Sequence, residues 1–157
     1  MNEFLEELKK YLEVCVSSDS DFTAAKTPTI LDGYQIQHTP SSTRPEIQVQ
    51  PMSNGENVNF TTFCGKKCNT IPVQITVYTG QVKIGKDMKS ARDASLIIAD
   101  KVEGYLYNYI YSATNPNLYY GRQMSSSPAM PMKVASATIY ATALRYTFNV
   151  AYPYVEG

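Results

Sequence analysis

The chain has 157 residues, of which 14 are basic and 14 acidic, so its formal net charge at pH 7 is zero. A neutral chain lacks the electrostatic footprint of a dedicated nucleic-acid or membrane-surface binder, and no apolar run approaches the roughly 20 residues of a membrane span. A chain of this length most simply forms one domain, which we place at residues 1–157. Three cysteines and an N-terminus without the basic start of a signal peptide lead us to expect a soluble protein from a reducing compartment.

The N-terminal segment has the periodicity of an amphipathic helix. Apolar residues recur at spacings of three and four, which predicts a helix over residues 3–16 with a single apolar stripe. Glu6 and Lys10 stand four residues apart, in the order that favours an ion pair along a helix, and the neighbouring Glu7 is expected to be solvated. The residues that follow, up to Asp32, show no clear period.

Four strands are predicted next, at residues 34–39, 46–52, 58–63 and 70–79. The first two are expected to form a hairpin, because the prolines and serines between them favour a loop. The last alternates apolar and polar side chains, which is the pattern of a strand with one buried face. Pro72, near the start of that strand, predicts that this end lies at a sheet edge or just outside the ladder.

The second half of the chain is predicted to hold the longest helix and the longest strand. The helix covers residues 87–109, a weaker strand follows at 119–124, and a loop at 125–131 leads into a strand over residues 138–152. At roughly 3.3 Å per residue the last strand would reach on the order of 50 Å, about two to three times the usual length. Gly104 inside the helix marks either a close packing contact or a weak point.

The order of these elements predicts an α+β fold. Short connections favour antiparallel pairing, so we expect a mostly antiparallel sheet of about four to six strands. An N-terminal helix and one long central helix are expected to pack on one face of it. A strand that reaches beyond its own domain is useful to a protein that builds a sheet or ring with copies of itself.

The long strand has two different faces. We expect the even-numbered residues from Tyr140 onward to pack under the helices, and the small odd-numbered residues around Arg145 to face outward or toward another subunit. Two roles stay open for Arg145: an ion pair with a helix acid such as Asp93 or Asp100, or a contact at a subunit interface, where arginine is enriched. The candidate subunit-interface residues are Arg145, Thr147, Asn149 and Tyr78.

The sequence offers few residues for catalysis or metal binding. Cys64 and Cys68 could complete a tetrahedral metal site only with Cys15 and His38, whose positions lack the spacing of a zinc motif. His38 is the only histidine, so a cysteine hydrolase would have to combine it with Cys64. A tight turn between strands, with the cysteines as small apolar residues, is the simpler interpretation. We therefore predict no enzyme, with no catalytic, cofactor-binding or metal-binding residues.

Four segments together resemble the tail terminator family of tailed bacteriophages, whose members are also called tail-completion or minor capsid proteins. The similarity lies in the pattern of strands and helices and spans about residues 45–150. The segments are NFTTFCG at 59–65, VQITVY at 73–78, SARDASLIIAD at 90–100 and ALRYTF at 143–148. The resemblance implies a small α+β domain that forms a ring of copies of itself, hexameric in this family, and has no catalytic residues. Such a ring caps the tail tube and ends its polymerisation.

The resemblance also implies a set of partners and a location. The partners are other copies of the chain, the tail tube protein, the head-tail connector or neck protein and, in a contractile tail, the sheath protein. DNA would be met only in transit through the lumen, and no membrane is involved. The protein would lie in the tail or neck of the virion after assembly in the bacterial cytoplasm. The alternatives are a head-completion or neck adaptor, another protein associated with the tail tube and, more remotely, a small cysteine hydrolase using Cys64 and His38.

Overall fold

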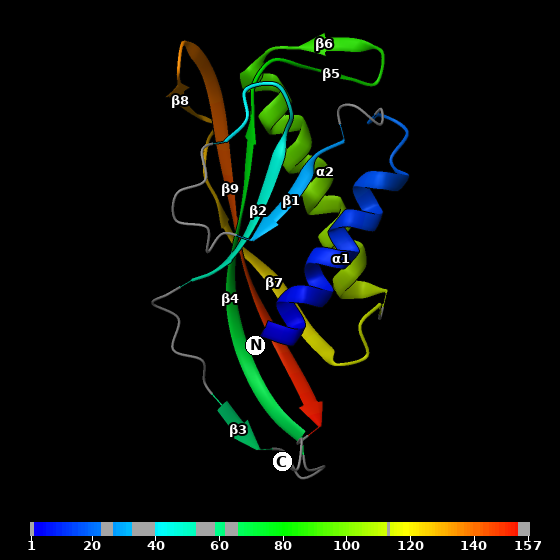
Figure 1. The fold of residues 1–157 in the computed structure, drawn as a ribbon. Coiled ribbons are helices and arrows are strands. Elements are labelled where there is room, and N and C mark those ends of the chain that lie inside the picture. Colours follow the sequence, from blue (N-terminus) through cyan, green and yellow to red (C-terminus); the bar gives the residue numbers. More distant parts are fainter. Residues whose placement is uncertain are drawn as a thin grey trace.

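The computed structural model describes residues 2–22, 27–32, 40–52, 59–61, 66–112 and 114–153. The described chain contains two helices, α1 (Asn2–Ser18) and α2 (Ala91–Tyr111), which lie on one side of a long curved sheet (Figure 1). The strands are β1 (Thr29–Asp32), β2 (Glu46–Pro51), β3 (Asn59–Thr61), β4 (Lys66–Thr79), β5 (Val82–Ile84), β6 (Asp87–Lys89), β7 (Leu118–Ser126), β8 (Met130–Val134) and β9 (Ala137–Pro153).

The main sheet confirms the expected α+β class. Its strands follow the order β1-β2-β4-β9-β7, and every neighbouring pair is antiparallel except β1 with β2. Two short strands extend this path, since β3 pairs with one end of β4 and β8 with one end of β9. The sheet thus has seven strands, of which the five on the main path lie within the expected range. Strands β5 and β6 form a separate hairpin.

Strands β4 and β9 form the longest strand pair of the sheet. Every residue of β4 is paired with β9, from Lys66 opposite Pro153 to Thr79 opposite Tyr140. Strand β9 runs unbroken for 17 residues, which confirms the long strand and corresponds to on the order of 55 Å. One end of this strand pair extends past the helices, so part of its length is not needed to cover the core (Figure 1).

The core lies between the helices and the sheet. Phe4, Leu8 and Leu12 of α1 are fully buried, and the ring of Phe4 lies 5.1 Å from that of Phe148 in β9. Burial of each such side chain contributes about 1.5–3 kcal/mol, so the α1 stripe holds the helix on the sheet. The expected helix and stripe are confirmed, although the ion pair of Glu6 forms with Lys9 at 3.7 Å.

The predicted start of the long helix at residue 87 is wrong. Asp87–Lys89 forms strand β6, which pairs with β5 across a turn where Gly85 adopts a φ of 65°. Helix α2 begins after Ser90, whose side chain accepts a hydrogen bond from the backbone N–H of Asp93. This cap satisfies an N–H group that the helix cannot bond, and so it sets the boundary.

Strands β1, β5 and β8 were not predicted, in addition to β6. Strand β1 has four residues and pairs in parallel with β2, which brings the apolar Ile30 against the core. The expected loop at 125–131 is wrong at both ends, because β7 continues to Ser126 and β8 begins at Met130. Strand β8 returns into β9 through a tight turn in which Ala135 has a positive φ of 55°. The predicted strand at 34–39 and its hairpin lie outside the described residues.

The prediction that the Pro72 end of the strand lies at a sheet edge or just outside the ladder is wrong, because β4 begins at Lys66 and Pro72 is paired with Thr147 of β9; only the pairing with β2 stops beside it. The last paired residues of β2 and β4 are Pro51 and Val73, and the N–H of Met52 then donates to the carbonyl oxygen of Pro72 at 3.0 Å. The return bond is missing because proline has no N–H group. The pairing of β2 with β4 therefore ends here, while the other edge of β4 continues along β9.

Candidate functional site

The two faces of β9 separate as expected from Ala141 onward, whereas Ile139 on the odd face is fully buried. On the even face Leu144, Tyr146 and Phe148 are buried in the core beneath the helices, and the Thr142 hydroxyl bonds that of Ser95 in α2 at 3.2 Å. On the odd face Arg145 is exposed, and the residues beside it are half-buried. The odd face therefore points away from both helices.

The face of the sheet that points away from the helices is termed the outer sheet face. No helix among the described residues covers it (Figure 1). Residues that are opposite in the strand register share a face, and the register joins β4, β9, β7 and β8 into one continuous surface. Its described side chains include Gln74, Thr76, Tyr78, Tyr120, Arg122, Met130, Met132, Ala141, Ala143, Arg145, Thr147, Asn149 and Ala151.

Arg145 is held at the centre of this surface by a neighbouring strand. Its Nε donates to Oε1 of Gln74, directly opposite in β4, at 3.3 Å. Helix α2 packs on the other side of the sheet, where Asp93 forms an ion pair with Arg92 at 3.6 Å. The proposed ion pair of Arg145 with a helix acid is therefore wrong, and the arginine is left available to a partner.

All four candidate interface residues lie on the outer sheet face. Thr147 and Asn149 follow Arg145 along β9, and Asn149 accepts a hydrogen bond from the Thr70 hydroxyl at 2.9 Å. Tyr78 lies farther along β4, opposite Ala141. The structure thus brings three of the four residues together and places the fourth on the same surface at some distance.

Tyr78 has an acidic neighbour. It is paired with Glu46 of β2, which is only 5% exposed and whose Oε1 accepts a hydrogen bond from the N–H of Ser41 at 3.2 Å. Burial raises the pKa of Tyr78, and the Glu46 carboxylate raises that pKa further. The phenol therefore stays neutral at physiological pH and can donate or accept a hydrogen bond.

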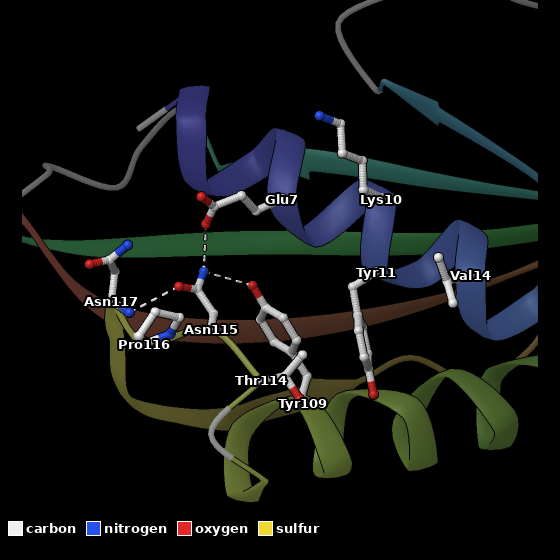
Figure 2. A pocket seen from close by; sticks show the side chains of 9 residues that line it. All are labelled: Glu7, Lys10, Tyr11, Val14, Tyr109, Thr114, Asn115, Pro116 and Asn117. Atoms are coloured by element: carbon white, nitrogen blue, oxygen red, sulfur yellow. Dashed lines mark hydrogen bonds between the residues drawn. The ribbon is translucent and has the colours of Figure 1, made fainter.

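A cavity of about 410 Å³ lies on the opposite side of the molecule. It opens between α1, the C-terminal part of α2 and the segment that precedes β7 (Figure 2). Much of its wall is aromatic or apolar, with a few polar groups. The lining residues are Glu7, Lys10, Tyr11, Val14, Tyr109, Thr114, Asn115, Pro116 and Asn117.

Asn115 organises the polar side of this cavity. Its amide nitrogen donates to Oε2 of Glu7 at 2.6 Å and to the Tyr109 hydroxyl oxygen at 3.0 Å, and its Oδ1 accepts from the N–H of Asn117 (Figure 2). The hydroxyl of Tyr152, near the end of β9, donates to the same oxygen of Glu7 at 2.8 Å. Burial and this bond to a carboxylate both raise the pKa of Tyr152. The cluster thus ties both helices to the end of the long strand.

The sequence did not reveal this cluster. Glu7 is half-buried rather than solvated, because it lies at the flank of the apolar stripe, three residues after Phe4 and four before Tyr11. That position is the only local signal, since Asn115 is 108 residues away along the chain. Tyr11 itself donates to the carbonyl oxygen of Tyr105 at 2.9 Å, and burial raises its pKa to about 12.

A second polar cluster joins the end of α1 to α2. The Lys101 ammonium donates to Asp19 and to Asp21, each at 2.8 Å, and the Tyr105 hydroxyl donates to Asp19 at 2.5 Å. Burial alone would raise the pKa of Asp19, but the bonds from Lys101 and Tyr105 outweigh it and lower that pKa. The backbone N–H of Gly85 also reaches Asp21, which connects the β5–β6 hairpin to the same point. This cluster, termed the clamp, holds the end of α1 against α2, and each of its charged groups has a hydrogen-bond partner.

The structure describes only some of the residues considered for metal binding or catalysis. His38 and Cys64 lie outside the described residues, as do residues 62–65 of the predicted turn, while Cys15 is free and half-buried in α1. Burial raises the pKa of the Cys15 thiol, which disfavours the reactive thiolate. In the described ranges no group of three or more His, Cys, Asp or Glu side chains could hold a metal ion.

No protein-family model and no curated protein matches the sequence. Any assignment of function therefore rests on the geometry of the structure. Neither α1 nor α2, the helices of the described ranges, combines the length and the apolar character that a bilayer crossing demands. The chain is therefore an α+β domain with two surface features of note: the outer sheet face and the cavity beside α1.

Proposed function

We propose that the protein is a structural subunit that assembles with copies of itself into a ring, and that the ring terminates a bacteriophage tail tube. The observation that carries this proposal is the long β4–β9 strand pair, one face of which is left without a covering helix. In an isolated domain, the part of a strand that extends past the helices does not cover the core. A sheet shared among subunits uses both the extra length and the open face.

The composition of the outer sheet face supports a protein partner. It carries small side chains at Ala141 and Ala143, which allow close approach, around an arginine held in place by Gln74. Exposed methionines at positions 130 and 132 add adaptable apolar area. Arginine and methionine are both enriched at protein interfaces, whereas a surface that only meets water needs neither.

A closed ring accounts for termination. Ring closure uses up the two complementary surfaces of every subunit, so a subunit ring cannot grow into a second tube layer by the same contacts. One side of the ring would match the last layer of tube protein and the other would meet the head-tail connector or neck. DNA in transit calls for weak contacts with the lumen, which a neutral chain provides.

The test is the length of tail tubes assembled with and without this protein. The cognate tube protein is polymerised in vitro, the purified chain is added at increasing ratios, and tube lengths are measured by negative-stain electron microscopy. Termination predicts shorter tubes and a protein bound at one end. Binding to the isolated connector with no effect on the tube would favour the neck-adaptor alternative, and decoration along the whole tube would contradict a terminator.

A further inference from the structure

The outer sheet face carries few charged side chains among the described residues. Among the described outer-face side chains of β4, β7, β8 and β9, the charged ones are Arg122 and Arg145, and both are exposed. Arg122 lies opposite Thr147, so the two guanidinium-bearing residues are diagonal neighbours at roughly 7–8 Å between backbones. Glu46 of β2 lies on the same face, opposite Tyr78, but is only 5% exposed. The exposed charges described on the outer sheet face are therefore basic, although the chain as a whole is neutral.

Helix α1 carries the opposite charge on its solvent side. Glu3, Glu6 and Glu13 are exposed there, whereas of the bases in the same helix Lys10 is exposed and Lys9 is half-buried. Glu6 and Lys9 form an ion pair at 3.7 Å, which partly neutralises both charges. The solvent side of α1, defined by Glu3, Glu6 and Glu13, is termed the acidic helix surface.

The cavity beside α1 adds a place for a cationic side chain. One carboxylate oxygen of Glu7 accepts hydrogen bonds from Asn115 and Tyr152, whereas no described residue donates to the other oxygen. The rings of Tyr11 and Tyr109 lie 4.7 Å apart and contribute to the wall. A free carboxylate oxygen beside aromatic rings is a chemical match for a guanidinium group, which takes both a charged acceptor and a stacking surface.

We propose that the basic outer sheet face of one subunit docks on the acidic helix surface of the next copy, in a head-to-tail contact. The two surfaces lie on opposite sides of the sheet, so they cannot meet within one chain but can meet between two (Figure 1). A symmetric contact of sheet face on sheet face would oppose arginine to arginine, and one of helix on helix would oppose acid to acid. Head-to-tail contacts generate rings when the rotation closes. The inference rests on the proposed function and specifies the contact that builds the ring.

The test uses two variants, each with one surface reversed in charge. One carries Arg122→Glu and Arg145→Glu, and the other carries Glu6→Lys and Glu13→Lys. Each alone opposes like charges at every head-to-tail contact, so each is expected to lose self-association by at least about tenfold in apparent Kd. In an equimolar mixture the contacts alternate between the original charge pair and its reversed version. The mixture is therefore expected to assemble although neither variant does alone.

Sedimentation velocity measures the assembly at low ionic strength, about 10 mM, where the Debye length is about 30 Å, and again at about 1 M salt, where it is about 3 Å. High salt is expected to weaken the wild-type assembly. Lys83→Glu, in the exposed part of the β5–β6 hairpin, serves as the control for a charge reversal outside both surfaces and is expected to assemble as wild type. Circular dichroism of each variant checks that it is folded.

Three results would overturn the inference. They are a wild-type chain that stays monomeric at low salt, an α1 variant that assembles normally, and a mixture that remains dissociated. Each concerns the contact between copies, whereas tube length tests the proposed function. A protein that shortens tubes but fails the mixing experiment forms its ring by other surfaces, and one that passes the mixing experiment without affecting tubes assembles for another purpose.

Discussion

Arg145 and Gln74 face each other across the centre of the longest strand pair, with the arginine Nε 3.3 Å from the glutamine Oε1. The bond orients the guanidinium group over the outer sheet face while leaving it exposed. A solvated arginine contributes little to the stability of its own chain, since exposed polar contacts are worth about 0–1 kcal/mol. Its orientation is more useful to a partner than to the fold.

Replacing Arg145 is therefore expected to weaken self-association while leaving the stability of the fold almost unchanged. Arg145→Ala should change the free energy of unfolding by less than about 0.5 kcal/mol and weaken self-association by about tenfold. Urea denaturation and sedimentation equilibrium measure the two quantities. Arg92→Ala is the matched control, because Arg92 is an exposed arginine of α2 on the other side of the sheet, and it should alter neither. Equal assembly of the two variants would count against the outer sheet face as an interface.

The Asn115 cluster is expected to contribute to stability. Asn115→Ala removes the amide that bonds both Glu7 and Tyr109 in a site where Asn115 is only 6% exposed. Leaving buried partners unsatisfied should cost about 1–3 kcal/mol of unfolding free energy. Asn117→Ala is the control, since the bonds recorded for Asn117 use its backbone and are kept. A cost for Asn115→Ala no larger than that of the control would show that water replaces the lost bonds.

Two glycines are expected to respond in opposite directions to alanine. A Cβ at Gly80 would lie 2.3 Å from the backbone oxygen of Ser42, so Gly80→Ala should destabilise the protein by about 1–3 kcal/mol. A Cβ at Gly104 in α2 would meet nothing within 4 Å, so Gly104→Ala should stabilise by about 0.5–1 kcal/mol. Gly104 is thus a weak point of the helix and not a packing contact. Thermal unfolding of both variants checks the signs, and a shift of the same sign in each would contradict this account.

Asp19 is expected to make stability fall in acid. Its pKa is lowered in the folded chain by Lys101 and Tyr105, against about 3.9 in the unfolded chain, so the unfolded state binds the proton more readily. The stabilisation is complete above about pH 5 and is lost as the pH falls through the folded pKa. The difference in unfolding free energy between wild type and Asp19→Asn should accordingly shrink between about pH 5 and pH 3.

A double-mutant cycle controls the Asp19 prediction. In a Lys101→Met background the carboxylate loses the closest cation, at 2.8 Å, and the acid-dependent part of the Asp19 contribution should diminish. Urea denaturation at a series of pH values measures all four chains. An Asp19→Asn effect that stays constant over that pH range would mean that the carboxylate charge is not what stabilises the clamp.

The elements that were predicted correctly are those with long local patterns. The α1 stripe repeats over about four turns, and the two side-chain classes of β9 alternate over residues 138–152, so each pattern outweighs local exceptions. Strand β1 has only four residues and gains its place from pairing with β2, which no local pattern records. The start of α2 was misjudged because the apolar Met88 extends the helical period, whereas the Ser90 cap and the turn at Gly85 place Asp87–Lys89 in a strand.

The candidate site residues also differ in how well the sequence predicts their positions. Period two along β9 was enough to place Arg145, Thr147 and Asn149 on one face, because alternation follows from strand geometry alone. The contact between Glu7 and Asn115 depends on how two helices and the end of β9 converge, and the two residues are 108 positions apart. A single sequence carries no signal for such a meeting, so that cluster could only be found in three dimensions.

The most direct test of the central claim is a cryo-electron microscopy map of tail tubes assembled with this protein. We expect a ring of this chain at one end of the tube, with Arg145 of each subunit at the contact with its neighbour. Tubes that end without the protein, or a ring in which the outer sheet faces point into solvent, would contradict the account.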